Sequence, residues 1–164
     1  MKEETYQIIV AGAGAAGLSL VMHFIDAGIN NDKQILVIDK SSKKENDRTW
    51  CFWETGKGLF EECVIQQWDH VSVYAPKFSK KLSLLPYRYK MIRGIDFYAY
   101  CFHKIKASKN ITIVNEAIQE ITTEGKVKTT EGVYNADLIF NSAISLTEKS
   151  SNYHQLLQHF KGWY

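Results

Sequence analysis

Three glycines near the N-terminus are spaced as G-x-G-x-x-G, at Gly12, Gly14 and Gly17, with Ala15 and Ala16 between the last two. In this pattern the first glycine makes a tight turn and the second lets the backbone approach a pyrophosphate. The third lets a helix pack close to a strand. Backbone N–H groups at the start of that helix can then bind phosphate oxygens, helped by the helix dipole. The spacing therefore predicts a dinucleotide-binding turn.

An acid follows at the distance that this chemistry requires. Asp39 ends an apolar run about 20 residues after the glycines, where a carboxylate can accept hydrogen bonds from a ribose. The carboxylate argues against a cofactor with a 2′-phosphate, although the neighbouring Lys40 weakens that argument. These residues do not choose between FAD and NAD, and they leave open an α/β scaffold that binds neither.

The elements around the glycines have the pattern of a strand, a helix and a second strand. Residues 6–12 and 34–40 are short runs rich in β-branched residues, which is typical of buried parallel strands. Apolar residues recur at helical spacing in residues 14–27, and Gly28 follows as a helix end. The chain is therefore predicted to have an α/β, Rossmann-like FAD/NAD(P)-binding fold with a parallel sheet.

The rest of the chain is predicted to hold further strands, one long helix and a short amphipathic C-terminal piece. The helix covers residues 94–108, and its expected buried face holds Ile95, Tyr98, Phe102 and Ile105. The predicted strands are residues 68–75, 80–85, 111–114, 117–122, 126–132 and 133–143, with a β-meander that turns at Glu124 and Gly125. The amphipathic piece covers residues 152–164.

The segment "DRTWCFWE", residues 47–54, is unusually aromatic. If it is extended, Trp50 and Phe52 share one face while Cys51 and Trp53 share the other. One interpretation is a strand buried between layers, and the other is a wall of a passage for an apolar ligand. Arg48 could reach cofactor phosphates or pair with a surface acid. Glu54 is interpreted as a solvated acid at the strand end.

A basic stretch, residues 76–93, carries six Lys and Arg side chains interleaved with aromatic residues. We interpret it first as the solvated face of a β-ribbon. Contact with an anionic membrane surface ranks second. Nucleic acid ranks last, because the formal net charge of the 164-residue chain is only +2.

Composition excludes several classes of protein. Apolar residues make up 45% of the chain and charged residues 23%, as in an ordinary globular domain. The three cysteines, an odd number without a C-x-x-C pair, are expected to be free thiols in a reducing cytoplasm. No cysteine or histidine stands at metal-ligand spacing, so no metal site is predicted. The N-terminus resembles no targeting signal, and no segment has the length and character of a membrane span.

Four segments, in this order, resemble the N-terminal part of bacterial lycopene β-cyclases: "VAGAGAAGLSL", "VIDK", "NDRTWCFWE" and "QHFKGW". That family belongs to the FAD-dependent proteins built like p-hydroxybenzoate hydroxylase. The glycine motif is shared by many flavoproteins, whereas the last two segments are much more specific to this family. The resemblance covers essentially the whole chain. It implies an FAD-binding domain over residues 1–164, with residues 45–93 contributing to the substrate side.

The resemblance also implies roles for individual residues. The three glycines would hold the FAD pyrophosphate and Asp39 the adenosine ribose. Arg48 and Thr49 would lie close to the cofactor, and Trp50 and Trp53 would lie between the cofactor and the carotenoid. The family reaction is a cyclisation of lycopene end groups to β-rings without net redox change. It uses an acid, a base and a flavin reduced by NAD(P)H or another donor. Location would be cytoplasmic, with peripheral contact to the inner membrane.

The sequence departs from the family in ways that affect function. Members continue well beyond "KGW", and the acids used for protonation fall in that later part, so no catalytic residue is assigned here. We expect this chain to be an incomplete domain, inactive alone. The strand ending at Asn141, Ser142 and Ala143 lacks the glycine that many flavoproteins have there. Alternatives are a fragment of another flavin-dependent hydroxylase or oxidase, or a stand-alone module that binds NAD or ADP.

Overall fold

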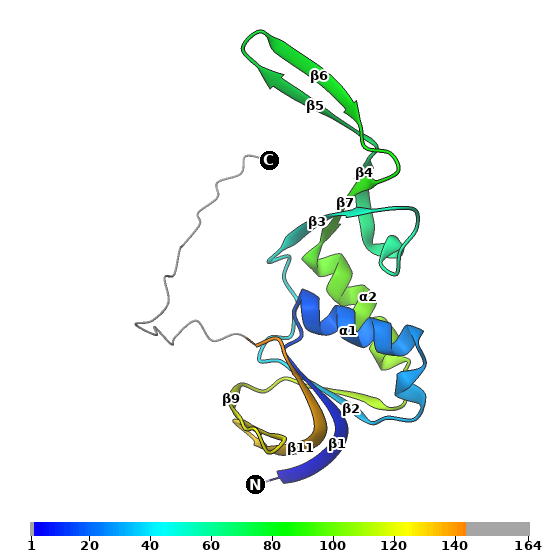
Figure 1. Cartoon of the computed structure of the whole chain (residues 1–164). Helices are drawn as coiled ribbons and strands as arrows, with labels where there is room; N and C mark the ends of the chain where they lie inside the picture. Colours follow the sequence, from blue (N-terminus) through cyan, green and yellow to red (C-terminus); the bar gives the residue numbers. More distant parts are fainter. Residues whose placement is uncertain (1, 144–164) are drawn as a thin grey trace.

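A computed structural model describes residues 2–143 of the chain. The predicted amphipathic piece at residues 152–164, including the family-like segment "QHFKGW", lies outside the described residues. The described part has two sheets with two α-helices between them, and a separate two-stranded ribbon that extends away from the body (Figure 1).

The larger sheet holds the predicted strand–turn–helix–strand unit. Strand β1 (Lys2–Ala11) pairs in parallel with β2 (Ile35–Ile38) on one side and β11 (Gly132–Asn141) on the other. Strand β8 (Ile111–Val114) extends the parallel part beyond β2. Strands β10 (Lys126–Thr129) and β9 (Ile118–Ile121) continue antiparallel from β11, which confirms the predicted meander. The sheet is therefore mixed, with strand order β8-β2-β1-β11-β10-β9.

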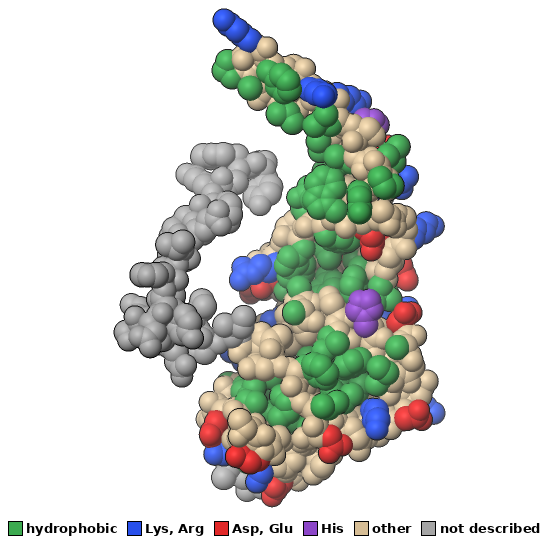
Figure 2. Space-filling model, in the orientation of Figure 1, with side chains coloured by type: hydrophobic (Ala, Val, Ile, Leu, Met, Phe, Trp, Pro, Cys, Tyr) green, Lys and Arg blue, Asp and Glu red, His purple; other side chains and the backbone are tan. Residues whose placement is uncertain are grey.

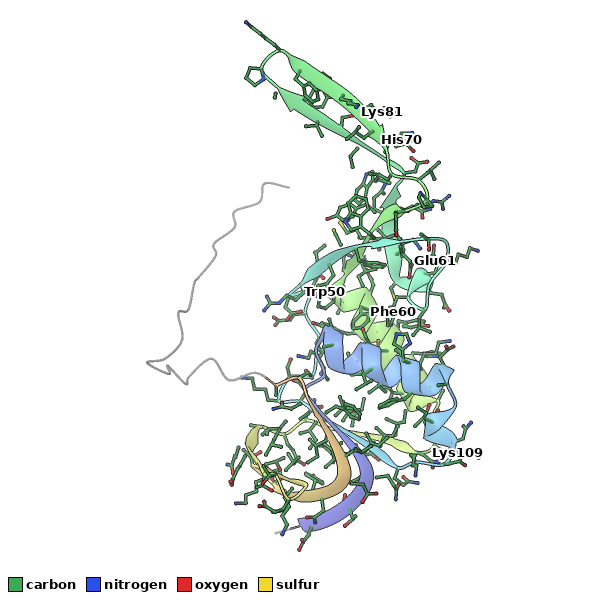
Figure 3. The ribbon with its side chains drawn as sticks, viewed as in Figure 1. Trp50, Phe60, Glu61, His70, Lys81 and Lys109 are labelled. Carbon is green, nitrogen blue, oxygen red and sulfur yellow. The ribbon has the colours of Figure 1, made fainter. Side chains whose placement is uncertain are left out.

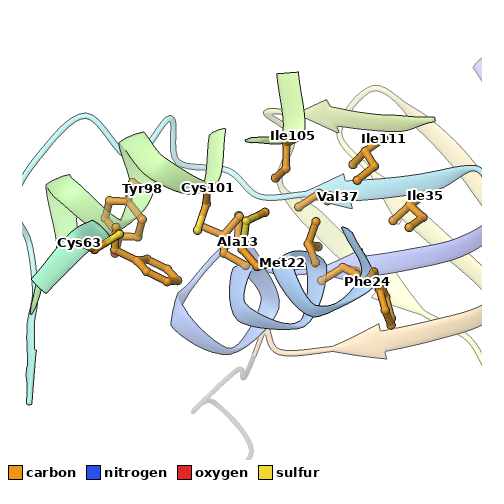
Figure 4. Packing of buried hydrophobic residues seen from close by; sticks show 14 of the residues in the cluster. Ala13, Met22, Phe24, Ile35, Val37, Cys63, Tyr98, Cys101, Ile105 and Ile111 are labelled. Atoms are coloured by element: carbon orange, nitrogen blue, oxygen red, sulfur yellow. The ribbon is translucent and has the colours of Figure 1, made fainter. Parts of the chain in front are cut away.

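Two helices cover one face of this sheet. Helix α1 (Ala15–Asp26) follows β1, and Gly28 just beyond its end has a left-handed φ of 72°, which supports the predicted helix end. Helix α2 (Gly94–Lys106) packs beside it. Side chains from both helices and from the parallel strands form the main core (Figure 4).

The buried face of α2 differs from the prediction. Tyr98 and Ile105 are buried as expected, but Phe97 and Cys101 complete the buried stripe in place of Ile95 and Phe102, which lie at its margins. Both stripes have helical spacing, so periodicity alone does not separate them. Contacts with residues outside the helix determine which stripe is buried. Phe97 contacts Trp50 and Phe60, with ring centroids 5.4 and 5.2 Å apart.

The second sheet lies on the far side of the helices from the first (Figure 1). It consists of β3 (Thr49–Glu54), β7 (Arg88–Arg93) and β4 (Val64–Trp68), all antiparallel, with β7 in the centre. Strand β7 was predicted only as part of an exposed basic stretch. The short 3-10 helices are η1 (Ile29–Asn31) and η2 (Glu61–Cys63).

The ribbon pairs β5 (His70–Ala75) with β6 (Phe78–Ser83). The predicted strand at residues 68–75 is thus divided between β4 and β5, and the one at residues 80–85 begins two residues earlier. Lys77, Lys80 and Lys81 lie on this ribbon and are exposed, as the solvated-face interpretation expects.

That interpretation is wrong for Lys90, whose side chain is fully buried. Its ammonium donates hydrogen bonds to Glu54 Oε2 (2.8 Å), to the Gly56 carbonyl oxygen (2.5 Å) and to Glu61 Oε2. Figure 3 labels Glu61 in this region. Glu54 is therefore not the solvated strand-end acid that the sequence indicated. A buried charge needs partners of opposite sign, and the fold supplies them from β3 and the η2 turn.

The contacts of Lys90 with Glu54 and Glu61 shift the pKa values of Lys90 and Glu61. The hydrogen bond from Lys90 lowers the pKa of the Glu61 carboxyl below its ordinary value of 4.5. Burial alone would lower the pKa of Lys90, but the hydrogen bonds to Glu54 and Glu61 outweigh it, so the pKa is raised. Lys90 therefore stays charged and ties three elements of the small sheet region together.

We predict that Lys90→Met lowers the free energy of unfolding at pH 7 by about 2 kcal/mol, because two carboxylates lose their shared cation. Glu61 stabilises the fold above pH 4.5, and this contribution is lost as the pH falls through its lowered folded pKa. As the pH is lowered from 6 into the acid range, the free energy of unfolding should therefore fall more for the wild type than for the variant. Urea unfolding monitored by circular dichroism measures both effects.

The control is Lys128→Met, which removes an exposed pair with Glu120 whose two side chains are 50% and 54% accessible. It should cost less than about 1 kcal/mol. Equal losses in the two variants would contradict a structural role for the Lys90 cluster.

Candidate nucleotide-binding site

The glycine turn joins the end of β1 to the start of α1. Gly12 has a φ of +106°, a conformation that side-chain-bearing residues rarely adopt, and its N–H donates to the Ile38 carbonyl (2.8 Å). A Cβ on Gly17 would overlap the Gly12 carbonyl oxygen. The helix thus packs directly against the backbone of the turn. Gly12 makes the tight turn and Gly17 allows the close approach of the helix, as predicted from their spacing.

Ser142 holds this turn from the neighbouring strand. Its N–H donates to the Ala11 carbonyl (2.8 Å), and its hydroxyl lies 3.1 and 3.0 Å from the carbonyl oxygens of Ala11 and Gly12. Parallel pairing of β11 with β1 brings Ser142 there. Sequence analysis noted only the missing glycine at this strand end and missed the serine. The signal that could have found it is a hydroxyl residue directly after a strand predicted to be central.

Gly14, by contrast, faces open space. A Cβ placed on it would meet nothing within 4 Å. It is the N-cap of α1, and among residues 2–143 no acceptor binds the backbone N–H groups of Gly14, Ala15, Ala16 or Gly17. Four donors that have no partner in the described part of the chain, at the positive end of a helix dipole, suit an anion. The turn therefore fits a pyrophosphate.

Asp39 lies at the same turn. One carboxylate oxygen accepts a hydrogen bond from the Ala13 N–H (2.7 Å) and the other from the Ser41 N–H (2.7 Å). The carboxylate is thus fixed beside the open amides, at the carboxyl end of β2. A fixed, partly buried acid in this position can accept hydrogen bonds from a hydroxyl pair.

The cation that pairs with Asp39 is Lys43, whose ammonium lies 3.2 Å from Asp39 Oδ2 and 5.8 Å from the centre of the Tyr98 ring. Lys40, which was predicted to contact the cofactor, is exposed. Lys43 was not among the predicted site residues, although its position four residues after Asp39 was a usable signal. Lys43 also lines a hollow of about 320 Å³. The other lining residues are Ser41, Ser42, Lys44, Glu45 and Asp47.

The loop that carries Arg48 and Thr49 is anchored to α2. The Gly94 N–H donates to the Arg48 carbonyl (2.7 Å), and the Tyr98 hydroxyl donates to Asp47 Oδ1 (2.9 Å). Burial, and then this hydrogen bond, raise the pKa of Tyr98 to about 12, so the hydroxyl remains a donor. The side chains of Arg48 and Thr49 are exposed, and neither contacts the glycine turn in the described structure.

The two tryptophans of the aromatic segment lie on opposite faces of β3, as the alternation predicted. Trp50 packs edge-on against Phe97 and Tyr98, with ring centroids 5.4 and 5.9 Å apart, and belongs to the core margin (Figure 3). Trp53 points outward and is 54% exposed. The segment is therefore core on one face and surface on the other, not a strand buried between layers.

Two further observations concern the described residues alone. In that part of the chain, no three His, Cys, Asp or Glu side chains are grouped as metal ligands. No helix there has the length and apolar character needed to cross a bilayer.

Several solved structures share this fold. PqsL from Pseudomonas aeruginosa, described as a probable FAD-dependent monooxygenase, matches with a TM-score of 0.65 and 11% identity, over 82% of this chain and 41% of that one. 2-Methyl-3-hydroxypyridine-5-carboxylic acid oxygenase gives 0.63 and 18%, over 82% and 38%. p-Nitrophenol 4-monooxygenase PnpA from Pseudomonas putida gives 0.62 and 12%, over 84% and 40%. The chain thus spans about two fifths of these structures.

These likenesses confirm the predicted α/β fold. No curated protein matches the sequence. The family described as lycopene cyclase protein matches residues 7–164, nearly the whole chain, and confirms the resemblance seen in its motifs. The chain therefore belongs to the lycopene cyclase family.

Proposed function

We propose that this chain binds the ADP half of FAD at the glycine turn. The observation that carries the proposal is the open row of N–H groups from Gly14 to Gly17, with the Asp39 carboxylate fixed 2.7 Å from the Ala13 N–H in the same turn. The amides would hold the pyrophosphate, and Asp39 would hold the adenosine ribose. Lys43, already beside Asp39, would face the nearer phosphate or ribose oxygens.

Flavin is favoured over NAD because the chain belongs to the lycopene cyclase family and its fold is shared with PqsL, which is described as a probable FAD-dependent monooxygenase. The segment with Arg48 and Thr49 is held at the start of α2 by the hydrogen bond from the Gly94 N–H to the Arg48 carbonyl. Their exposed side chains would extend the cofactor contacts. A fragment of another flavin-dependent hydroxylase and a stand-alone NAD-binding or ADP-binding module remain the competing functions.

The proposed reaction is the acid–base cyclisation of lycopene end groups to β-rings, in line with the family. When bound and reduced by NAD(P)H, FAD would supply negative charge that stabilises a carbocation. The described residues would bind and orient the cofactor, and the apolar outer side of β3 would keep water from the substrate. We assign no catalytic acid within this chain.

A carotenoid dissolves in lipid, so we also propose peripheral contact with the cytoplasmic face of the inner membrane. The β5–β6 ribbon carries Lys77, Lys80 and Lys81 and no acidic residue, so its charge complements an anionic bilayer.

We predict that the purified chain binds FAD and that Gly14→Val weakens binding at least about tenfold, because the side chain would occupy the space for the pyrophosphate. Its fold should survive, since nothing lies within 4 Å of that position. Gly17→Ala is the contrasting variant and should lower the melting temperature through its overlap with the Gly12 carbonyl. Titration calorimetry with FAD, and separately with NAD, measures the affinities. Binding of NAD alone would contradict the proposal.

For the cyclisation, we predict that cells accumulating lycopene form β-ring products when the chain is joined to the C-terminal half of a lycopene cyclase. Gly14→Val in that fusion should abolish the products, and fractionation of the same cells should recover the protein with membranes. A fusion that binds FAD and leaves lycopene unchanged would refute the cyclase assignment and favour another flavin-dependent activity.

A further inference from the structure

One peptide group in the glycine turn, the one that joins Gly12 to Ala13, is bound at both of its ends. The Ala13 N–H donates to Asp39 Oδ2 (2.7 Å), and the Gly12 carbonyl oxygen accepts a hydrogen bond from the Ser142 hydroxyl (3.0 Å). The two side chains come from different strands, since Asp39 follows β2 and Ser142 follows β11. A peptide group is planar, so its C=O and N–H cannot turn separately. The two contacts therefore depend on each other.

The Ser142 hydroxyl is not needed to join the strands. The Ser142 N–H already donates to the Ala11 carbonyl (2.8 Å) and continues the pairing of β11 with β1. The hydroxyl lies 3.1 Å from the same Ala11 oxygen, but its single proton has a second acceptor in the Gly12 carbonyl. Among the hydrogen bonds within residues 2–143, that carbonyl has no other donor. The hydroxyl therefore contributes most at Gly12.

The Gly12 carbonyl oxygen lies directly beneath helix α1. A Cβ on Gly17 would overlap it, so the helix backbone covers one side of this oxygen. A covered carbonyl without a donor is unfavourable. Gly12 itself does not fix the orientation of the peptide, because glycine has access to more backbone conformations than other residues, including the φ of +106° seen here. The orientation thus depends on the two side-chain hydrogen bonds.

This orientation matters because a concentrated positive surface does not replace it. On the face shown in Figure 2, Lys and Arg side chains are dispersed and do not gather at one place. The formal net charge of the chain is only +2. Selection of a nucleotide therefore depends on directed groups, which are the N–H groups at the start of α1 and the Asp39 carboxylate.

We propose that Ser142 is a positioning residue of the nucleotide site, which acts on Asp39 through the Gly12–Ala13 peptide group. Donation to the Gly12 carbonyl polarises the peptide and strengthens the hydrogen bond from the Ala13 N–H to the carboxylate. Asp39 is then presented to a ribose in one orientation. The inference rests on the proposed function for the ligand. It adds a residue outside the glycine motif, whose effect reaches the ligand through Asp39.

The first measurement needs no ligand and follows hydrogen exchange of the Ala13 amide in the purified chain by NMR. Ser142→Ala should speed this exchange about tenfold, because the peptide loses one of its two side-chain bonds. Ser142→Thr returns the hydroxyl, and Ser142 is only partly buried, so the rate should return to within about twofold of wild type.

Ser108→Ala is the matched control. The Ser108 hydroxyl also donates to a main-chain carbonyl, that of Lys104 (3.2 Å), but it does so at the end of α2. This variant should leave the exchange of the Ala13 amide unchanged. The melting temperatures of Ser142→Ala and Ser108→Ala should agree, because the main-chain bond of Ser142 still joins the strands.

The second measurement is the affinity for FAD by titration calorimetry. Ser142→Ala should weaken binding about fivefold, and Ser142→Thr should bind like the wild type. In a chain that already carries Asp39→Ala, the change Ser142→Ala should weaken binding by less than about twofold, because the carboxylate that it positions is gone. A residue that only stabilised the sheet would weaken binding equally in both backgrounds.

Unchanged exchange of the Ala13 amide in Ser142→Ala would overturn the proposal. Equal losses of FAD affinity with and without Asp39 would overturn it as well, and so would a failure of Ser142→Thr to restore the exchange rate. A wild-type chain that binds no FAD would refute the proposed cofactor alone. In that case the exchange rates of the Ala13 amide still decide whether Ser142 acts on Asp39.

Discussion

The contact between helix α1 and the turn beneath it is the constraint on which the nucleotide site depends. Gly17 lies so close to the Gly12 carbonyl that no side chain fits between them. This contact fixes the direction of α1 relative to β1, and with it the direction of the free N–H groups in the first helical turn. A larger residue at position 17 would push the helix away from the turn and change the placement of these N–H groups.

Parallel pairing then brings three separate chain segments to that point. The carboxyl ends of β1, β2 and β11 lie side by side, so the glycine turn, Asp39 and Ser142 become neighbours. Each of the last two binds a different part of the turn: Asp39 receives the Ala13 N–H, and Ser142 lies against the Gly12 carbonyl. Ligands of open α/β sheets bind at this end of the strands, where the loops diverge. The geometry of the candidate site thus follows from sheet topology as much as from the glycine motif.

The sequence predicted the parts of this arrangement that local pattern controls. The glycine turn, helix α1, the two first strands and the meander all follow from short-range periodicity and glycine placement. The buried Lys90 could not be predicted, because its partners Glu54 and Glu61 lie 36 and 29 residues away and only tertiary pairing brings them together. For the same reason a basic stretch that resembled one solvated ribbon became a central strand plus a ribbon. Lys43 and Ser142 were missed because their roles depend on where neighbouring strands end.

The small sheet shows how one aromatic segment serves two purposes. Alternation along β3 sends Trp50 into the packing with α2 and Trp53 to the outer face, so the two tryptophans have different surroundings on the same strand. The Lys90 cluster lies on the inner side of this sheet and keeps β3, β7 and η2 in register.

The most direct test of the account is amide NMR of the ¹⁵N-labelled chain titrated with FAD. We predict the largest shift changes at the N–H groups of Gly14, Ala15, Ala16 and Gly17, with a smaller change at Ala13 as Asp39 gains a ribose partner. Binding of FAD with unchanged signals in the glycine turn, and changes only elsewhere, would contradict the central claim that this turn holds the pyrophosphate.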